Sequence, residues 1–153
     1  MTAATSNTQT ALTDSLNRLL ADCFALYLKT KNFHWHVRGP QFRDLHLLFD
    51  EQATELITTT DLIAERVRKL GQPTLTSIGS IASRQSVKDE DGHPDATKML
   101  ADLRDDNRNL VKALRSAKEL ASDAGDNATD GLIDDWTDQA EQRAWFLDAT
   151  LGR

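Results

Sequence analysis

The chain of 153 residues has one cysteine, three prolines and no long apolar run. The single Cys23 excludes an intrachain disulfide, and the first residues show neither the basic residues nor the apolar stretch of a secretion signal. No uninterrupted apolar segment approaches the roughly 20 residues that a membrane-spanning helix needs. We therefore expect a cytoplasmic protein that has no membrane partner.

Acidic residues outnumber basic ones. The chain has 18 lysines and arginines against 24 aspartates and glutamates, a formal net charge of -6. No lysine or arginine precedes Arg18, and Arg153 ends the chain without a basic extension. The negative net charge repels nucleic-acid phosphates. Proteins bind those phosphates mainly through lysine and arginine, which the first residues lack. We expect little or no DNA binding and regard cations as the natural partners.

Apolar residues recur at the three- and four-residue spacing of a helix over four long segments. These segments are residues 10–38, 41–70, 95–124 and 127–151. Gly39 with Pro40, Gly71 with Pro73, and Gly125 provide the stop signals between helices. We expect residues 1–9 to form a flexible tail and residues 10–153 to form a single domain.

The four helices are joined by two short connections and one long one. Residues 72–94 are rich in Gly, Ser, Asp and Pro, and only Ile78 and Ile81 suggest a short helix within them. Short connections make the first two helices antiparallel and the last two antiparallel, whereas the long crossover makes the second and third parallel. This order predicts an all-α, ferritin-like four-helix bundle.

Four potential metal ligands lie on one side of the second helix. His46, Asp50, Asp61 and Glu65 fall within an arc of about 100° at the flank of its apolar stripe. A single helix keeps His46 and Glu65 roughly 28 Å apart at a rise of 1.5 Å per residue. The chain alone therefore cannot gather all four around one site.

A second copy of the same helix can bring them together. Facing residues of an antiparallel pair have position numbers of constant sum, and His46 with Glu65 has the same sum as Asp50 with Asp61. A two-fold axis near residues 55 and 56 would set these pairs opposite each other. The hairpin through Gly39 and Pro40 adds His34 beside His46. This register predicts a site shared between two identical subunits.

Two imidazoles and three carboxylates suit iron, and on ligand type alone they also suit manganese or zinc. Carboxylates can bridge two metals and tolerate the change from Fe(II) to Fe(III). Taken singly, His34 or His46 has a simpler explanation as a hydrogen-bonded core histidine, and Asp61 with Glu65 as a solvated face. The joint pattern favours the metal site. The single Glu-x-x-His match, at Glu90, lies in the crossover and predicts no di-iron site inside one bundle.

Residues 27–71 resemble the Dps family of miniferritins, the DNA-binding proteins from starved cells. The resemblance rests on a set of residues together with the run 61–71: His34, Trp35, Val37, Gly39, Phe42, Leu45, His46 and Asp50. The last two helices are similar more loosely, through Trp145 and Phe146. The resemblance implies a dodecamer built from two-fold dimers, a hollow shell that oxidises Fe(II), typically with hydrogen peroxide, and stores the ferric product.

The resemblance also implies roles for individual residues. The ferroxidase ligands, which would hold two irons at each intersubunit site, correspond to His34, His46, Asp50, Asp61 and Glu65. Trp35 resembles the tryptophan that takes up an oxidising equivalent, although burial of an aromatic ring is the commoner role of such a residue. His36 stands where the family usually has asparagine, and helical spacing points it away from His34.

A row of acidic residues marks the start of the last helix. Asp126, Asp130, Asp134 and Asp138 recur every four residues. With the resemblance, the first three are expected to line a pore for iron uptake at a three-fold axis. An ordinary solvated acidic face at a helix N-terminus is the alternative.

Three functions from different classes fit the sequence. The first is a ferroxidase that stores iron and protects against oxidative stress, with oxygen as the alternative oxidant. The second is a DNA-compacting stress protein with a secondary metal site, which the tail composition disfavours. The third is a purely structural bundle, which would leave the shared sum of positions as a coincidence.

Overall fold

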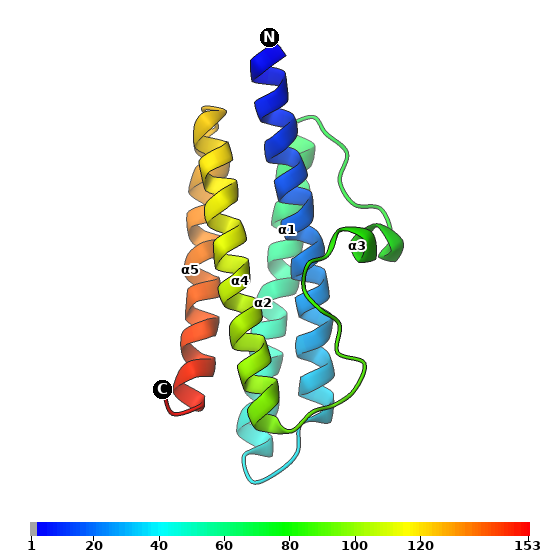
Figure 1. The fold of residues 1–153 in the computed structure, drawn as a ribbon, viewed down its shortest axis with the longest axis vertical. Coiled ribbons are helices and arrows are strands. Elements are labelled where there is room, and N and C mark those ends of the chain that lie inside the picture. Colours follow the sequence, from blue (N-terminus) through cyan, green and yellow to red (C-terminus); the bar gives the residue numbers. More distant parts are fainter. Residues whose placement is uncertain (1–2) are drawn as a thin grey trace.

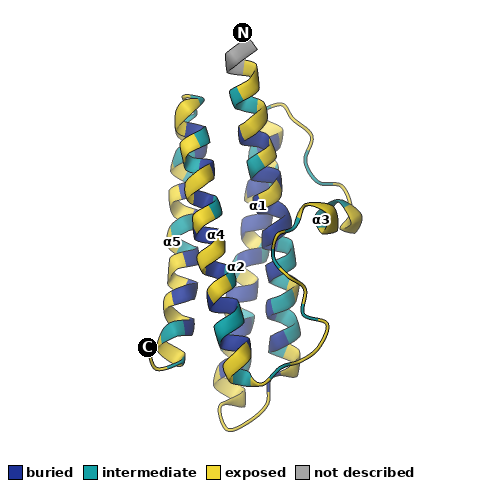
Figure 2. Cartoon of the chain, in the orientation of Figure 1, coloured by how far each residue is buried: buried dark blue, intermediate teal, exposed yellow. Residues whose placement is uncertain are grey.

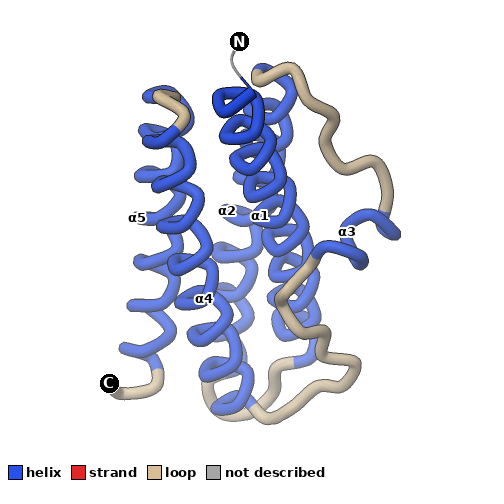
Figure 3. The backbone as a smooth tube through the Cα atoms, turned by 45° about the horizontal axis from the view of Figure 1, so that its top comes forward, coloured by secondary structure: helices blue, strands red, loops and turns tan. Residues whose placement is uncertain are grey.

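The computed structural model describes residues 3–153, which fold into an elongated helical bundle (Figure 1). Its helices are α1 (Ala3–His36), α2 (Phe42–Lys69), α3 (Ile78–Arg84), α4 (Ala96–Asp123) and α5 (Asn127–Thr150). The long helices lie side by side, and α3 stands beside the bundle within the crossover (Figure 3). Helices α2 and α4 run in the same direction, so the predicted ferritin-like topology is confirmed.

The helices end where the sequence places its stop signals. Gly39, Gly71 and Gly125 all have positive φ values of 118°, 82° and 67°, which cost glycine little because it has no Cβ. At the other end of a helix, the Asp95 side chain accepts a hydrogen bond from Lys98 N at 2.9 Å and caps α4. Local sequence chemistry therefore sets the lengths of the elements.

The N-terminal part of the prediction needs correction. We predicted from the sequence that residues 1–9 form a flexible tail. In the structure α1 begins at Ala3 and includes residues 3–9. Residues 1–2 lie outside the described part of the chain. No glycine or proline before residue 10 interrupts the helix. Gln9 Nε2 also donates to Leu70 O at 3.2 Å, which ties this turn to the end of α2.

The core lies between the four long helices and is largely aliphatic (Figure 2). Its fully buried side chains include Leu16, Phe33, Phe49, Ile63 and Leu103. Phe33 and Phe49 pack with ring centroids 6.4 Å apart and connect α1 to α2 directly beside the predicted ligands. This contact fixes the two helices that carry the candidate site.

A buried polar network crosses the centre of the bundle. Arg143 Nε donates to Asn107 Oδ1 at 2.7 Å, its guanidinium pairs with Glu55, and Gln52 Nε2 donates to the Arg143 carbonyl at 3.2 Å. These bonds join α2, α4 and α5. A buried arginine is tolerable only when its charge and donors are matched in this way, so the network fixes the position of α2.

The long crossover is anchored to α1 rather than loosely attached. The buried Asp22 carboxylate accepts hydrogen bonds from Ser86 N and Oγ, both at 2.6 Å, and from Val87 N at 3.0 Å. Thr74 Oγ1 donates to Asn17 Oδ1 at 2.8 Å, nearer the N-terminus of α1. The crossover thus lies along one side of the bundle. No helix in residues 3–153 is long and apolar enough to cross a membrane.

Candidate metal centre

Two histidines predicted to meet at the α1–α2 hairpin do so. His34, near the end of α1, and His46, in the second turn of α2, stack with ring centroids 3.9 Å apart and an interplanar angle of 14°. Each ring also contacts the other residue's backbone: His34 Nδ1 lies 2.6 Å from His46 O, and His46 Nδ1 lies 2.8 Å from His34 O. The hairpin is thereby closed by a reciprocal pair of hydrogen bonds.

These contacts decide which ring nitrogens can bind a cation. A carbonyl oxygen only accepts, so both Nδ1 atoms must carry a proton, and in the neutral rings both lone pairs reside on Nε2. Metal-binding histidines in proteins are commonly held in this way, with the second nitrogen donating to a backbone carbonyl. The hairpin therefore presents two oriented imidazoles.

Asp50 is the third residue that one chain brings to this place. Its Oδ1 lies 3.8 Å from His34 Nε2 and accepts a hydrogen bond from Lys31 Nζ at 2.8 Å. The Lys31 hydrogen bond, helped by the positive charge, lowers the pKa of Asp50 from its ordinary value. Asp50 is therefore an anion at neutral pH. We refer to His34, His46 and Asp50 as the half-site.

Aromatic rings flank the half-site. Phe42 packs on His46 with ring centroids 5.0 Å apart, which covers one face of the imidazole. Trp35 is 58% exposed in the single chain, and Lys31 Nζ lies 5.6 Å from the centre of its ring. Burial of Trp35 within its own subunit is thus excluded as the reason for an aromatic residue there.

The other two predicted ligands do not reach the half-site within one chain. Asp61 and Glu65 lie on the same helix, four to five turns beyond His46, and both are exposed. In the described part of the chain, no three histidine, cysteine, aspartate or glutamate side chains are grouped closely enough to hold a metal ion. The five-residue site therefore remains a prediction that depends on a second subunit.

The acidic row at the start of α5 is paired with groups of its own chain. Asp126 caps α5 by accepting from Thr129 N at 3.0 Å, and it pairs with Arg66 at 3.3 Å. Lys118 Nζ contacts Asp130 and lies 2.7 Å from Asp134 Oδ1. Asp126 thus has a structural role, and one lysine offsets part of the charge of the other two.

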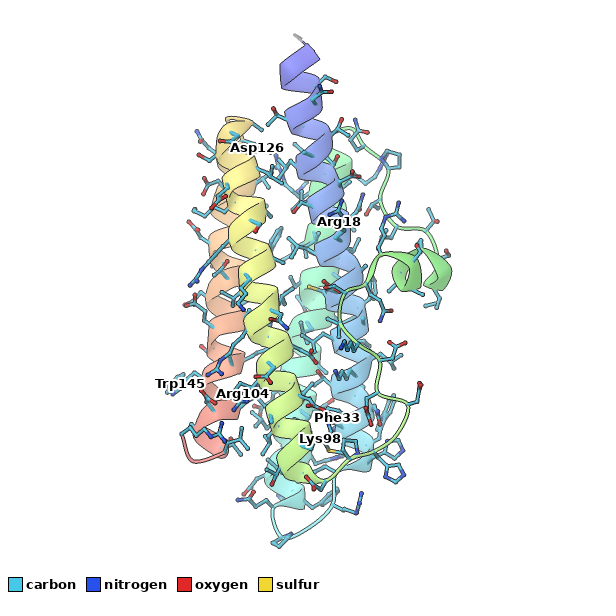
Figure 4. All side chains as sticks on the ribbon, in the orientation of Figure 1. Arg18, Phe33, Lys98, Arg104, Asp126 and Trp145 are labelled. Carbon is cyan, nitrogen blue, oxygen red and sulfur yellow. The ribbon has the colours of Figure 1, made fainter. Side chains whose placement is uncertain are left out.

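Burial raises the pKa of Asp126, but its hydrogen bonds with Thr129 and its pairing with Arg66 outweigh burial, so the net shift is downward. The carboxylate therefore stays charged through the neutral range. Asp126 lies at the end of the bundle opposite Phe33, the residue that precedes His34 (Figure 4). The two sets of predicted residues are separated along the length of the molecule.

Sequence reasoning missed the cations that pair with these carboxylates. Lys31 precedes His34 by three residues and so shares its face of α1, a spacing that could have identified it as the partner of Asp50. Lys118 and Arg66 come from other helices, and no spacing within α5 could have revealed them. His36 contacts Asn32 and His93 instead of the half-site, in line with its predicted direction.

Comparison with known proteins agrees with this geometry. Residues 13–153 match the family described as a ferritin-like domain. A DNA protection during starvation protein from Brevibacillus brevis is 35% identical over 136 residues, which cover 89% of this chain and 91% of that protein.

Solved structures agree as well. The X-ray structure of Dps from Thermosynechococcus elongatus has a TM-score of 0.96 at 28% identity, covering 99% of this chain and 96% of that one. A Dps protein from Vibrio cholerae O1, described as a member of a broad superfamily of ferritin-like diiron-carboxylate proteins, has a TM-score of 0.90 at 30% identity, over 95% of this chain and 91% of that one. The chain belongs to the ferritin-like family and, within it, to the Dps miniferritins.

Proposed function

We propose that this protein oxidises Fe(II) at di-iron sites shared between two-fold related subunits and stores the ferric product inside a shell of twelve subunits. His34, His46 and Asp50 of one subunit would bind iron together with two carboxylates of the other, from Asp61 and Glu65. The reciprocal hydrogen bonds between the hairpin histidines support this proposal most strongly, because they leave both Nε2 atoms as ligands beside Asp50.

The exposed surface of α2 supports a shared site. Leu47 and Leu62 lie next to the predicted ligands and are each 43% exposed, and Leu28 of α1 is also exposed. Large apolar side chains on one side of a helix pair are typical of a surface that another subunit covers. An antiparallel copy of α2 would cover them and, in the predicted register, would bring Asp61 and Glu65 to the half-site.

The reaction balances with peroxide as the oxidant. Two Fe(II) ions give up one electron each, one hydrogen peroxide accepts both electrons, its O–O bond breaks, and two protons complete two water molecules. Three carboxylates stabilise the Fe(III) product, because hard anionic oxygen ligands favour the higher charge. Oxygen is the alternative oxidant. Consuming Fe(II) and peroxide together would protect the cell from oxidative damage.

Lys31 would regulate access to Asp50. Its ammonium group lies 2.8 Å from Asp50 Oδ1, one of the two carboxylate oxygens that could bind iron. Iron binding through Oδ1 would displace Lys31, whose Nζ already lies 5.6 Å from the centre of the Trp35 ring. We assign Trp35, which follows His34 directly in the chain, the role of taking up an oxidising equivalent.

We assign the passage of iron into the shell to Asp126, Asp130 and Asp134. Their contacts with Arg66 and Lys118 mean that the field at such a pore depends on these cations as well as on the carboxylates. DNA compaction is the second candidate, and the name of the Brevibacillus brevis relative favours it. The net charge of -6 and the absence of lysine and arginine before Arg18 argue against it.

The decisive experiment measures Fe(II) oxidation by the purified assembly with peroxide and with oxygen. The double variant Asp61→Ala, Glu65→Ala should lose rapid oxidation while keeping its oligomeric size. A control variant, Asp14→Ala, Glu119→Ala, removes the same charge from exposed positions of α1 and α4 and should keep the wild-type rate. Wild-type rates in the first variant would refute the assignment.

A mixing experiment tests whether the ligands come from two chains. His46→Ala and Glu65→Ala subunits, each inactive alone, should regain part of the activity when refolded together. Mixed dimers contain one site with every ligand, because His46 and Glu65 of one site come from different chains. Verified mixed dimers without any recovery would place all the ligands in a single chain.

A further inference from the structure

Two histidines outside the proposed iron site face each other across the end of the crossover. His36 ends α1, and His93 lies in the crossover shortly before α4. Their ring centroids are 5.3 Å apart, with an interplanar angle of 17°. Both side chains are exposed, so the pair is not explained by burial in the core.

The His36 ring is held in one orientation. Its Nδ1 lies 2.8 Å from the backbone oxygen of Asn32 and 2.7 Å from the Asn32 side-chain oxygen. Both oxygens accept, so Nδ1 carries the proton and the lone pair of the neutral ring is on Nε2. This is the arrangement that the half-site histidines also show, and it prepares Nε2 to bind a cation.

The same asparagine holds the segment that carries His93. Asn32 Nδ2 donates to Glu90 O at 3.0 Å and to Gly92 O at 3.1 Å. Pro94 follows His93 directly and restricts its backbone to extended conformations. One side chain of α1 therefore fixes the His36 ring and the backbone of the segment that carries His93.

The spacing of the rings matches that of two ligands on one ion. With metal–nitrogen bonds of about 2.0–2.1 Å and tetrahedral angles, the centroids of two imidazoles lie roughly 5.2 Å apart. The observed separation is 5.3 Å, but the rings are stacked with an interplanar angle of 17°, so one ring must turn about its side-chain bonds before both Nε2 atoms can reach one ion. Offset ring stacking also tolerates this distance, so stacking without a metal is the alternative that an experiment must separate.

The chemistry selects the class of cation. Neutral imidazole nitrogens suit Zn(II), Cu(II) and Ni(II), whereas Mg(II) and Ca(II) prefer oxygen ligands. Glu90 and Asp91 add negative charge in the same segment. No third histidine, cysteine or acidic side chain joins a metal-sized group in residues 3–153, so water would complete the coordination.

We propose that His36 and His93 form a second metal site, separate from the iron-oxidation site, that binds one borderline transition-metal cation per subunit, with Cu(II) the tightest of the series. The proposal does not rest on the proposed function.

Copper binding to the full assembled protein tests this site. Equilibrium dialysis with Cu(II) and electron paramagnetic resonance should be run in the His34→Ala, His46→Ala background, which removes the competing imidazole pair of the half-site. Adding His36→Asn or His93→Asn should remove about one copper per subunit and abolish the two-nitrogen hyperfine pattern. Asn32→Ala keeps both rings but frees them, and should weaken copper binding by about tenfold.

Iron oxidation and oligomeric size in otherwise wild-type protein are the controls, and neither should change in His36→Asn or His93→Asn. Unchanged copper stoichiometry and nitrogen coupling in both variants would show that the rings only stack. If the ferroxidase proposal were wrong, the number of copper ions bound per subunit at His36 and His93 would not change. The two proposals can therefore be refuted independently.

Discussion

The half-site and the acidic row of α5 both consist of residues that a sequence search selects as cation ligands, yet their surroundings differ. At the half-site, backbone carbonyls orient two imidazoles and leave Nε2 unengaged by the bond that fixes each ring. In the acidic row, the carboxylates of Asp126, Asp130 and Asp134 are engaged by donors of their own chain. The presence of ligand-type residues is therefore weak evidence for a metal site. Stronger evidence is that their lone pairs are not already engaged by donors of the same chain.

This contrast predicts that the two regions respond to mutation on different scales. Replacing His34 and His46 together by alanine should slow Fe(II) oxidation by more than about 100-fold, since losing even an outer hydrogen-bond partner of a ligand costs about 10- to 100-fold. Stopped-flow absorbance of the ferric product measures this. His36→Ala removes an imidazole from the same helix and serves as the control. A decrease of less than tenfold in the oxidation rate would show that the half-site histidines are not essential ligands.

The second prediction concerns the structural role of Asp126. Asp126→Ala should lower the free energy of unfolding by about 1 kcal/mol, the usual cost of losing an N-cap. Thermal unfolding monitored by circular dichroism measures this. Asp126→Asn keeps the capping oxygen and should lose less. An Asp126→Ala variant as stable as the wild type would show that the cap does not contribute.

The stability difference between wild type and Asp126→Asn should depend on pH, because the pKa of Asp126 is lowered. Burial raises this pKa, but the hydrogen bonds with Thr129 and the pairing with Arg66 lower it further. A carboxyl with a lowered folded-state pKa stabilises the fold above its ordinary pKa and loses this contribution as pH falls through the folded-state value. The stability gap between wild type and Asp126→Asn should therefore be present at neutral pH and close in acid. A gap that widens in acid would contradict the pairing.

The third prediction concerns the lysine that occupies the half-site. Lys31→Met removes the competitor for Asp50, so the pKa of Asp50 should rise toward its ordinary value and Fe(II) should bind about threefold tighter, the scale of an exposed ion pair. Anaerobic equilibrium dialysis measures the affinity. Lys98→Met breaks an exposed lysine–aspartate pair of α4 and is the matched control. Equal affinity in both variants would rule out competition by Lys31.

The smallest effect is expected at the acidic row. Asp130→Asn, Asp134→Asn should slow iron uptake about twofold at low ionic strength, and less in high salt, because the field of exposed charges is screened. Lys118→Met should act in the opposite direction by removing their partner. Uptake at the wild-type rate in low salt would leave these aspartates as a solvated face.

Much of this fold could be predicted from local sequence signals. Gly39, Gly71 and Gly125 end helices where the sequence predicts, and Ile78 begins the short helix of the crossover. The N-terminal start was missed because the polar residues before residue 10 lack the apolar stripe on which the prediction relied. The contact between Gln9 and Leu70 O, which ties this turn to α2, spans 61 residues and has no local signature.

The candidate site also has one part that local sequence signals predict and another part that they do not. The contact between His34 and His46 follows from a short hairpin, so helical spacing was sufficient to predict it. The pairing of Arg143 with Glu55 spans 88 residues and depends on how α5 packs on α2, which no periodicity reveals. Asp61 and Glu65 require a second chain, and a shared sum of position numbers is a hypothesis about symmetry that one subunit does not test.

The reciprocal histidine bonds have a consequence for the order of events in the cell. They link residues only twelve apart in sequence, so the half-site can form as soon as the hairpin closes, before any subunit meets another. A newly made chain would then carry an oriented but incomplete reaction centre. Under the proposed mechanism, oxidation begins only on dimerisation, so ferric product would not precipitate on solitary chains that have no shell to contain it.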